Sequence, residues 1–214
     1  MSEHDDLVKA QQETLARPRL QYSFAARFFF FAMDLVTGKA TTLSKAKLIE
    51  TLASIPYRAW EGKKYVALSL DYAKDAQVKT DMGIVDWSRW AQDNEYGHLL
   101  VLEEKMRQDG IKDAWYLAWF IRWAFITKYR LFSWLFARLS LRAAWRFNGE
   151  FEDHAEHVYA QAVADHPEWE TQLAKGSYAE QFYPGLTTWA DVVRQISLDE
   201  RHHRDKSFEL AQQV

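Results

Sequence analysis

Two copies of a Glu-x-x-His motif constrain this chain more than any other feature of its sequence. They are Glu95-Tyr-Gly-His98 and Glu200-Arg-His-His203. On an α-helix, side chains three positions apart leave the same face about one turn apart. Each motif can therefore direct a carboxylate and an imidazole at one point. A single motif of this kind is common on a solvated helix face, so a wider pattern is needed before either pair is interpreted as metal ligands.

Two further glutamates, at positions 50 and 152, supply that wider pattern. The four acidic positions are separated by 45, 57 and 48 residues, and each interval is long enough for one helix and a connection. Ferritin-like di-iron proteins take one Glu from each of two helices and Glu-x-x-His from each of the other two. Oxygen and nitrogen donors suit iron or manganese, and two divalent ions offset four carboxylates that are costly to bury alone. The pattern predicts a pair of iron ions bound by Glu50, Glu95, His98, Glu152, Glu200 and His203.

The residues around the two single glutamates leave alternatives open. Glu50 follows Leu48 and Ile49, which favours burial over a place on the surface. The choice of Glu152 is harder, because other acids and two histidines surround it and helical periodicity does not select among them. A solvated acidic face would show the same pattern. The competing side chains are Glu150, Asp153, His154, Glu156 and His157.

Composition favours long helices. The 214 residues include only 8 glycines and 4 prolines, which argues against a turn-rich β fold. We expect an all-α, ferritin-like four-helix bundle with additional membrane-facing amphipathic helices, formed by a single domain over 19–210 after a flexible N-terminus over 1–18. The expected bundle helices cover 43–73, 84–108, 142–165 and 188–210. The chain lacks cysteine, which excludes disulfides and iron–sulfur ligation, and its net charge of −3 does not suggest nucleic-acid binding.

At these positions the sequence resembles the alternative oxidases, including the plastid terminal oxidases. The similarity covers roughly 17–210, with the same order and spacing of four motifs. These are Leu-Ile-Glu-Thr-Leu-Ala-Ser-Ile-Pro at 48–56, Asn-Glu-Tyr-Gly-His-Leu-Leu at 94–100, Phe-Glu-Asp-His-Ala-Glu-His-Val-Tyr at 151–159 and Asp-Glu-Arg-His-His-Arg-Asp at 199–205.

The resemblance implies roles for particular residues. It selects Glu152 as the ligand on the third helix, and it implies that Tyr159 is a catalytic tyrosine beside the metals. It also implies that Asn94, Asp199 and Arg204 orient the ligands from behind.

The sequence departs from the family at positions expected near the quinol pocket. Lys45 stands where the family has Arg, His154 interrupts a run of glutamates, and Val158 replaces Thr. Together with Ile49, these residues are expected to bind the substrate. The metal ligands are therefore conserved in type, while the substrate site is altered.

Residues 112–147 combine twelve aromatic and seven basic side chains with a single acid, Asp113. Aromatic rings with basic tips suit the boundary between lipid headgroups and acyl chains. A buried aromatic helix with a solvated basic stripe, or a dimer interface, would show a similar composition. Single-stranded nucleic acid also fits such interleaving, but the acidic balance elsewhere disfavours it. The resemblance implies a homodimer embedded in one leaflet, with quinol reaching the metals through a hydrophobic channel.

The expected function is a membrane-associated quinol oxidase that reduces O2 to water without pumping protons. Because no transit peptide precedes the bundle, we expect a monotopic protein on the cytoplasmic face of a bacterial inner membrane. The alternative is a desaturase or hydroxylase that acts on another hydrophobic substrate at the same centre. A third possibility is a non-enzymatic bundle that stores iron or binds membranes.

Overall fold

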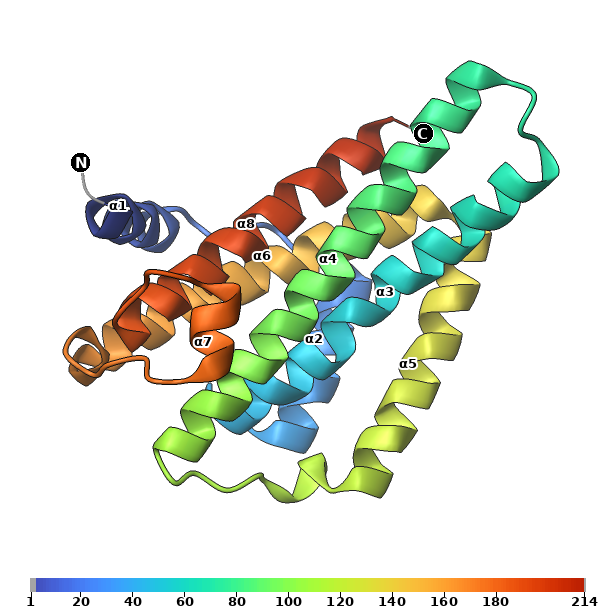
Figure 1. The fold of residues 1–214 in the computed structure, drawn as a ribbon. Helices are drawn as coiled ribbons and strands as arrows, with labels where there is room; N and C mark the ends of the chain where they lie inside the picture. Colours follow the sequence, from blue (N-terminus) through green and yellow to red (C-terminus); the bar gives the residue numbers. More distant parts are fainter. Residues whose placement is uncertain (1–2, 214) are drawn as a thin grey trace.

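The computed structural model describes residues 3–213, and within that range it is all-α, as the sequence predicts. An isolated bridge between Leu173 and Thr188 is the sole β-type pairing among these residues. The elements, in chain order, are α1 Glu3–Ala16, α2 Phe24–Thr37, α3 Leu43–Leu70, α4 Asp75–Gln108, the 3-10 turn Trp115–Leu117, α5 Trp119–Leu139, α6 Leu141–Asp165, the 3-10 turn Pro167–Glu170, α7 Ser177–Phe182 and α8 Trp189–Gln212 (Figure 1).

Four long helices form the bundle, and they pack as two pairs. α3 lies along α4, and α6 lies along α8 (Figure 1). The largest apolar cluster joins Val101 of α4 to Ala155 of α6 and Ile196 of α8, all of them buried. The same bundle buries glutamates on all four of its helices and histidines on α4, α6 and α8.

Hydroxyl side chains begin three of the bundle helices. Thr42, Ser140 and Thr188 each accept a hydrogen bond from the backbone N–H three residues ahead, as N-cap residues do. The cap at Thr188 lies where the sequence predicts it. α4 differs from expectation because it begins at Asp75, not near 84. Its first turns are anchored to α3 by the buried Asp81, which lies 2.7 Å from Lys64 Nζ.

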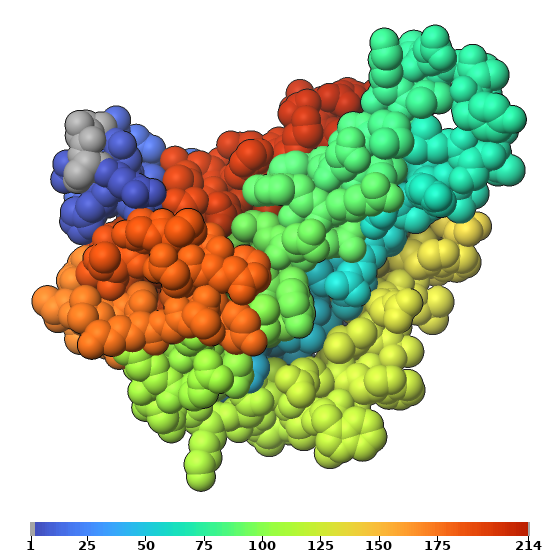
Figure 2. Space-filling model, in the orientation of Figure 1, coloured from blue at the N-terminus to red at the C-terminus, as the bar shows by residue number. Residues whose placement is uncertain are grey.

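Two of the helices outside the bundle, α2 and α5, expose large apolar side chains. α2 contacts α6, and α5 contacts α3 and α6. Phe24 of α2 is 76% exposed and Trp119 of α5 is 75% exposed. Figure 2 shows α5 (yellow) along the edge of the molecule opposite α1 (blue). Among the described residues, none of the helices combines the length and apolar character needed to cross a membrane.

The N-terminal region differs from the flexible segment expected over 1–18. Glu3–Ala16 forms α1, which packs against α6 and α8 and buries Leu7. Arg17, immediately after α1, donates to the buried carboxylates of Asp153 at 2.6 Å and Glu156 at 2.8 Å. The sequence hid this contact because the polar segment finds its charge partners more than a hundred residues away.

We expect Arg17→Ala to lower the free energy of unfolding by about 2–3 kcal/mol, because it leaves two buried carboxylates with fewer cationic partners. Urea denaturation followed by circular dichroism measures the change. The matched control is Lys9→Ala, since Lys9 is exposed and its Nζ lies 4.0 Å from Glu13. That variant should change stability by less than about 0.5 kcal/mol. Equal effects of the two substitutions would contradict the docking role of Arg17.

Candidate metal centre

The structure brings together all six residues that the sequence predicts as ligands. Each bundle helix contributes, with one glutamate from α3, one glutamate from α6 and a Glu-x-x-His pair from α4 and from α8. Every one of these side chains is buried, with at most 1% of its surface exposed: Glu50, Glu95, His98, Glu152, Glu200 and His203.

Their donor atoms form two groups that share two carboxylates. In each group the four donor atoms lie within 4.8 Å of one another. One group is Glu50, Glu95, His98 and Glu200, and the other is Glu95, Glu152, Glu200 and His203. Glu95 and Glu200 belong to both groups, as bridging carboxylates of a two-metal site do. Each group also contains one further carboxylate and one imidazole, Glu50 with His98 in the first and Glu152 with His203 in the second.

Most of the donor atoms lie close to one another without forming hydrogen bonds, although His203 Nδ1 lies within hydrogen-bonding distance of Glu200, at 3.2 Å. Nδ1 of His98 lies 3.3 Å from Glu50, 3.4 Å from Glu95 and 3.2 Å from Glu200, yet it makes no hydrogen bond. Both carboxylate oxygens of Glu95 and one of Glu152 are also buried without a partner. Buried polar atoms are nearly always hydrogen-bonded. Donor atoms that converge without pairing fit metal ions between them, and this oxygen and nitrogen set suits iron or manganese.

Without metal cations, the crowded negative charges of the cluster raise the pKa values of several of its own side chains, so that these side chains bind protons. Burial and the neighbouring carboxylates of Glu200 and Glu95 raise the pKa of Glu50 to about 8. Burial, with the same two neighbours, raises the pKa of Glu152 well above its usual value. Burial alone would lower the pKa of His203, but Glu95 and Glu200 beside it raise that pKa well above the ordinary range. Metal ions that bind here must therefore displace protons.

Glu152 is distinguished from its acidic neighbours by what surrounds it. Glu150, Asp153 and Glu156 are also buried, each at most 2% exposed, so none belongs to a solvated face. Asp153 and Glu156 pair with Arg17. Glu152 instead accepts hydrogen bonds from neutral groups on one of its oxygens, which leaves its charge to be balanced within the metal site.

Those neutral groups are Tyr57 of α3 and Asn148 of α6, which the sequence analysis missed. Tyr57 Oη donates to Glu152 Oε1 at 2.9 Å, and Asn148 Nδ2 donates to the same oxygen at 2.8 Å. Asn148 also donates to Tyr57 at 3.0 Å. The four-residue spacing between Asn148 and Glu152 places both on one helix face and could have revealed Asn148. Nothing local in the sequence identifies Tyr57.

Asp199 orients the opposite ligand, as the resemblance implies. His98 Nε2 lies 3.3 Å from Asp199, within hydrogen-bonding distance. Tyr183 donates to the same carboxylate at 3.0 Å, and Asn94 donates to it at 3.4 Å. A carboxylate behind the far nitrogen fixes the orientation of a ligating imidazole.

Arg204 does not touch a ligand directly. Its guanidinium forms an ion pair with Glu156 and lies 3.8 Å from Asp153. Both acids neighbour Glu152 on α6, so the contact between Arg204 and the ligands is indirect.

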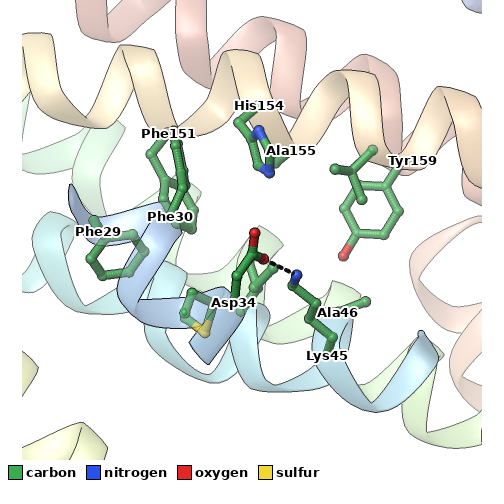
Figure 3. A pocket seen from close by; sticks show the side chains of 12 residues that line it. Phe29, Phe30, Asp34, Lys45, Ala46, Phe151, His154, Ala155 and Tyr159 are labelled. Carbon is green, nitrogen blue, oxygen red and sulfur yellow. Dashed lines mark hydrogen bonds and ion pairs between the residues drawn. The ribbon is translucent and has the colours of Figure 1, made fainter. Parts of the chain in front are cut away.

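Tyr159 connects the cluster to a cavity, whose lining side chains are drawn in Figure 3. Its hydroxyl donates a hydrogen bond to Glu50. The cavity, about 40 Å³ in volume, is lined by Tyr159 and by the four residues predicted to bind substrate, Lys45, Ile49, His154 and Val158, together with side chains of α2, among them Phe29, Phe30, Met33 and Asp34. Tyr159 also lines a second cavity of about 490 Å³, whose wall includes Thr42 and Trp169.

The polar groups of the first cavity are an ion pair and a neutral histidine. Lys45 Nζ donates to Asp34 at 2.5 Å. The imidazole of His154 stacks on Phe30 with 4.2 Å between ring centroids. Burial, with the positive charges of Arg19 and Lys45, lowers the pKa of His154 to about 4. His154 is therefore uncharged at neutral pH.

Comparison with known proteins agrees with this geometry. A family model described as Alternative oxidase matches residues 7–212, which include all six clustered side chains. No curated protein is detectably similar to the chain.

We expect ferrous or manganous ions to stabilise the protein, by about 2.7 kcal/mol at a hundredfold excess over the dissociation constant. The rise in melting temperature should be larger at about pH 8 than at about pH 6, because the protons held by the ligands compete with the ions as pH falls. Thermal denaturation with and without metal measures both effects.

The variants Glu95→Ala and Glu200→Ala remove the shared carboxylates, so they should abolish the metal-induced rise. The control is Glu180→Ala, since Glu180 is an exposed residue of α7. An equal rise in all three variants would show that the ions bind elsewhere.

Proposed function

The chain belongs to the alternative oxidase family, and we propose that it is a quinol oxidase that reduces O2 to water at a pair of iron ions. The observation that supports this proposal most strongly is the sharing of Glu95 and Glu200 between two adjacent groups of donor atoms. The iron pair would accept electrons from quinol and supply them to O2.

The protein's own residues hold and orient that centre. The two shared carboxylates would bridge the ions, Tyr57 and Asn148 hold Glu152, and Asp199 holds His98. Tyr159 keeps its hydroxyl proton directed at Glu50 while its ring lines the first cavity. It therefore lies between substrate and ligands, where it can pass a proton or an electron.

We propose that the quinol head group binds in the cavity between α2 and α6. Aromatic and aliphatic side chains suit its ring. Arg19 donates to Nδ1 of His154 at 3.2 Å, which leaves the Nε2–H of the neutral imidazole to donate a hydrogen bond to a quinol oxygen. A volume of about 40 Å³ holds little more than one water molecule. Binding therefore requires side chains of α2, such as Met33, to move aside.

The same altered pocket supports a second candidate, a desaturase or hydroxylase. Lys45, His154 and Val158 all line the cavity and all depart from the family pattern. Product analysis separates the two candidates. A quinol oxidase forms quinone and water, whereas the alternative introduces oxygen or a double bond into a lipid.

We further propose that α2 and α5 bind one leaflet of a membrane. Both expose apolar rings, including Phe28 at 61% and Trp123 at 64%, and α5 carries the basic residues Arg122 and Arg130. An oxidase held in one leaflet would translocate no charge. The family resemblance also supports a homodimer, which we place on the cytoplasmic face of a bacterial inner membrane.

We expect oxygen uptake driven by a short-chain quinol, measured with an oxygen electrode. Tyr159→Phe should keep its iron but lose about 100-fold or more in rate, as expected for loss of a proton-transferring group. Glu95→Ala and Glu200→Ala should lose both iron and uptake. The control Tyr72→Phe alters a tyrosine that is 78% exposed and should not change the rate. Full activity in metal-free protein would refute the proposal.

We expect the protein to sediment with vesicles that contain anionic phospholipid. The double variant Trp119→Ser/Trp123→Ser should bind at least about tenfold more weakly, because each buried indole contributes about 2 kcal/mol. The matched control Tyr72→Ser removes an exposed aromatic ring from the α3–α4 connection. Equal loss in the control, or no loss in the double variant, would argue against α5 as the membrane face.

A further inference from the structure

Two tryptophans of α4 pack against a predicted metal ligand. The indole rings of Trp87 and Trp90 stack on each other with 5.0 Å between centroids. Each meets the ring of His203 edge-on, Trp87 at 5.8 Å and Trp90 at 5.4 Å. His202, the residue beside the ligand, lies 5.3 Å from both indoles. The four rings form a continuous aromatic cluster.

This cluster extends from the bundle interior to solvent. His203 is fully buried, Trp87 is half-buried and Trp90 is 44% exposed. A second aromatic chain leaves the site through Tyr57, Trp60 and Trp145, but it ends in the core, where Trp60 and Trp145 are each 1% exposed. The Trp87–Trp90 pair therefore connects the site to molecules in solution, whereas the other chain does not.

The proposed reaction needs electrons, and the Trp87–Trp90 pair could carry electrons from solution to the metal site. Reduction of O2 to two waters consumes four electrons, and two ferrous ions supply two of them. Quinol provides the remainder when its cavity is filled. If O2 arrives while that cavity is empty, reduction stops at peroxide unless the two missing electrons come from the protein or through it.

We propose that Trp87 and Trp90 form an electron relay through which one-electron reductants in solution, of the ascorbate or thiol class, reduce the centre when quinol is absent. This inference rests on the proposed function. An electron passes toward His203 from Trp87, which regains one from Trp90, or from Trp90 itself, whose ring lies 5.4 Å from that of His203. The oxidised Trp90 then takes an electron from ascorbate, which becomes its radical and releases a proton. In sum, the centre gains one electron for each ascorbate oxidised.

The surroundings of the two indoles give this relay a direction. The Nε1–H of Trp87 is buried and has no hydrogen-bond acceptor. An oxidised Trp87 therefore has no group to which it can pass its proton, and it is not trapped as a neutral radical. The exposed Trp90 can release its proton to water. We therefore expect the longest-lived tryptophan radical to form at Trp90, where a dissolved reductant can reach it.

The test exposes anaerobically reduced, iron-loaded protein to O2 without quinol, with catalase present to remove diffusing peroxide. Peptide mass spectrometry then locates added oxygen. We expect modification at Trp90 in the iron-loaded protein, its loss in metal-free protein and its suppression by ascorbate. In Trp87→Phe the yield should fall without vanishing, because Trp90 still contacts His203 directly. Met82, on the same helix and 39% exposed, reports oxidants arriving from solution and should be modified equally in all samples.

A second variant keeps the interior intact. Trp90→Phe alters an exposed position, and it should slow several-fold the oxidation of ascorbate that accompanies exposure of the ferrous protein to O2, measured as loss of ascorbate absorbance. Equal modification of Trp90 with and without iron, modification that ascorbate does not suppress, or an unmodified Trp90 in iron-loaded protein would overturn the relay.

Quinol-driven oxygen uptake, measured on the same preparation, separates the two proposals. Uptake with an unmodified Trp90 overturns the relay alone. A chain that binds no iron overturns the proposed oxidase and the relay with it.

Discussion

Four carboxylates buried at the centre of the bundle are the constraint on which the rest of the structure depends. The α3–α4 and α6–α8 pairs meet across these acids and two imidazoles. Unpaired buried charge is too costly to persist, so the cluster must hold either protons or metal ions. The raised pKa values of Glu50 and Glu152 favour protonation. The donor atoms without hydrogen bonds favour metal ions. Metal ions bound at this cluster would therefore couple their binding to folding.

A second layer of buried charge lies on α6, outside the ligand cluster, and it explains how α1 is held. Asp153 and Glu156 are fully buried and require cations, which Arg17 supplies after α1 and Arg204 supplies from α8. The charges of Asp153 and Glu156 are thus balanced by guanidinium groups, whereas that of Glu152 is balanced within the candidate metal site. The contacts of Arg17 that balance buried charge on α6 also hold α1 against the bundle.

Sequence reasoning succeeded where function or helix geometry imposes a local pattern. The Glu-x-x-His pairs and the Thr188 cap depend on spacing within one helix, and all are found as expected. It failed where a polar residue takes its meaning from a distant partner. Tyr57 reaches Glu152 across 95 positions, and no periodicity encodes that contact. The acids of α6 were ambiguous because all of them are buried, and only their partners tell them apart.

Access to the centre depends on an outer helix and not on the bundle itself. The ligand helices are tied together by buried charge, so their relative positions are fixed. α2 is held against α6 largely by ring contacts, with Phe29 packed on Phe151 and Phe30 on His154, and against α3 by the ion pair from Asp34 to Lys45. These contacts line the cavity and would be the first to yield to a flat aromatic substrate. In the proposed function, a rigid centre beside a displaceable wall would admit a hydrophobic molecule to Tyr159 without disturbing the ligands.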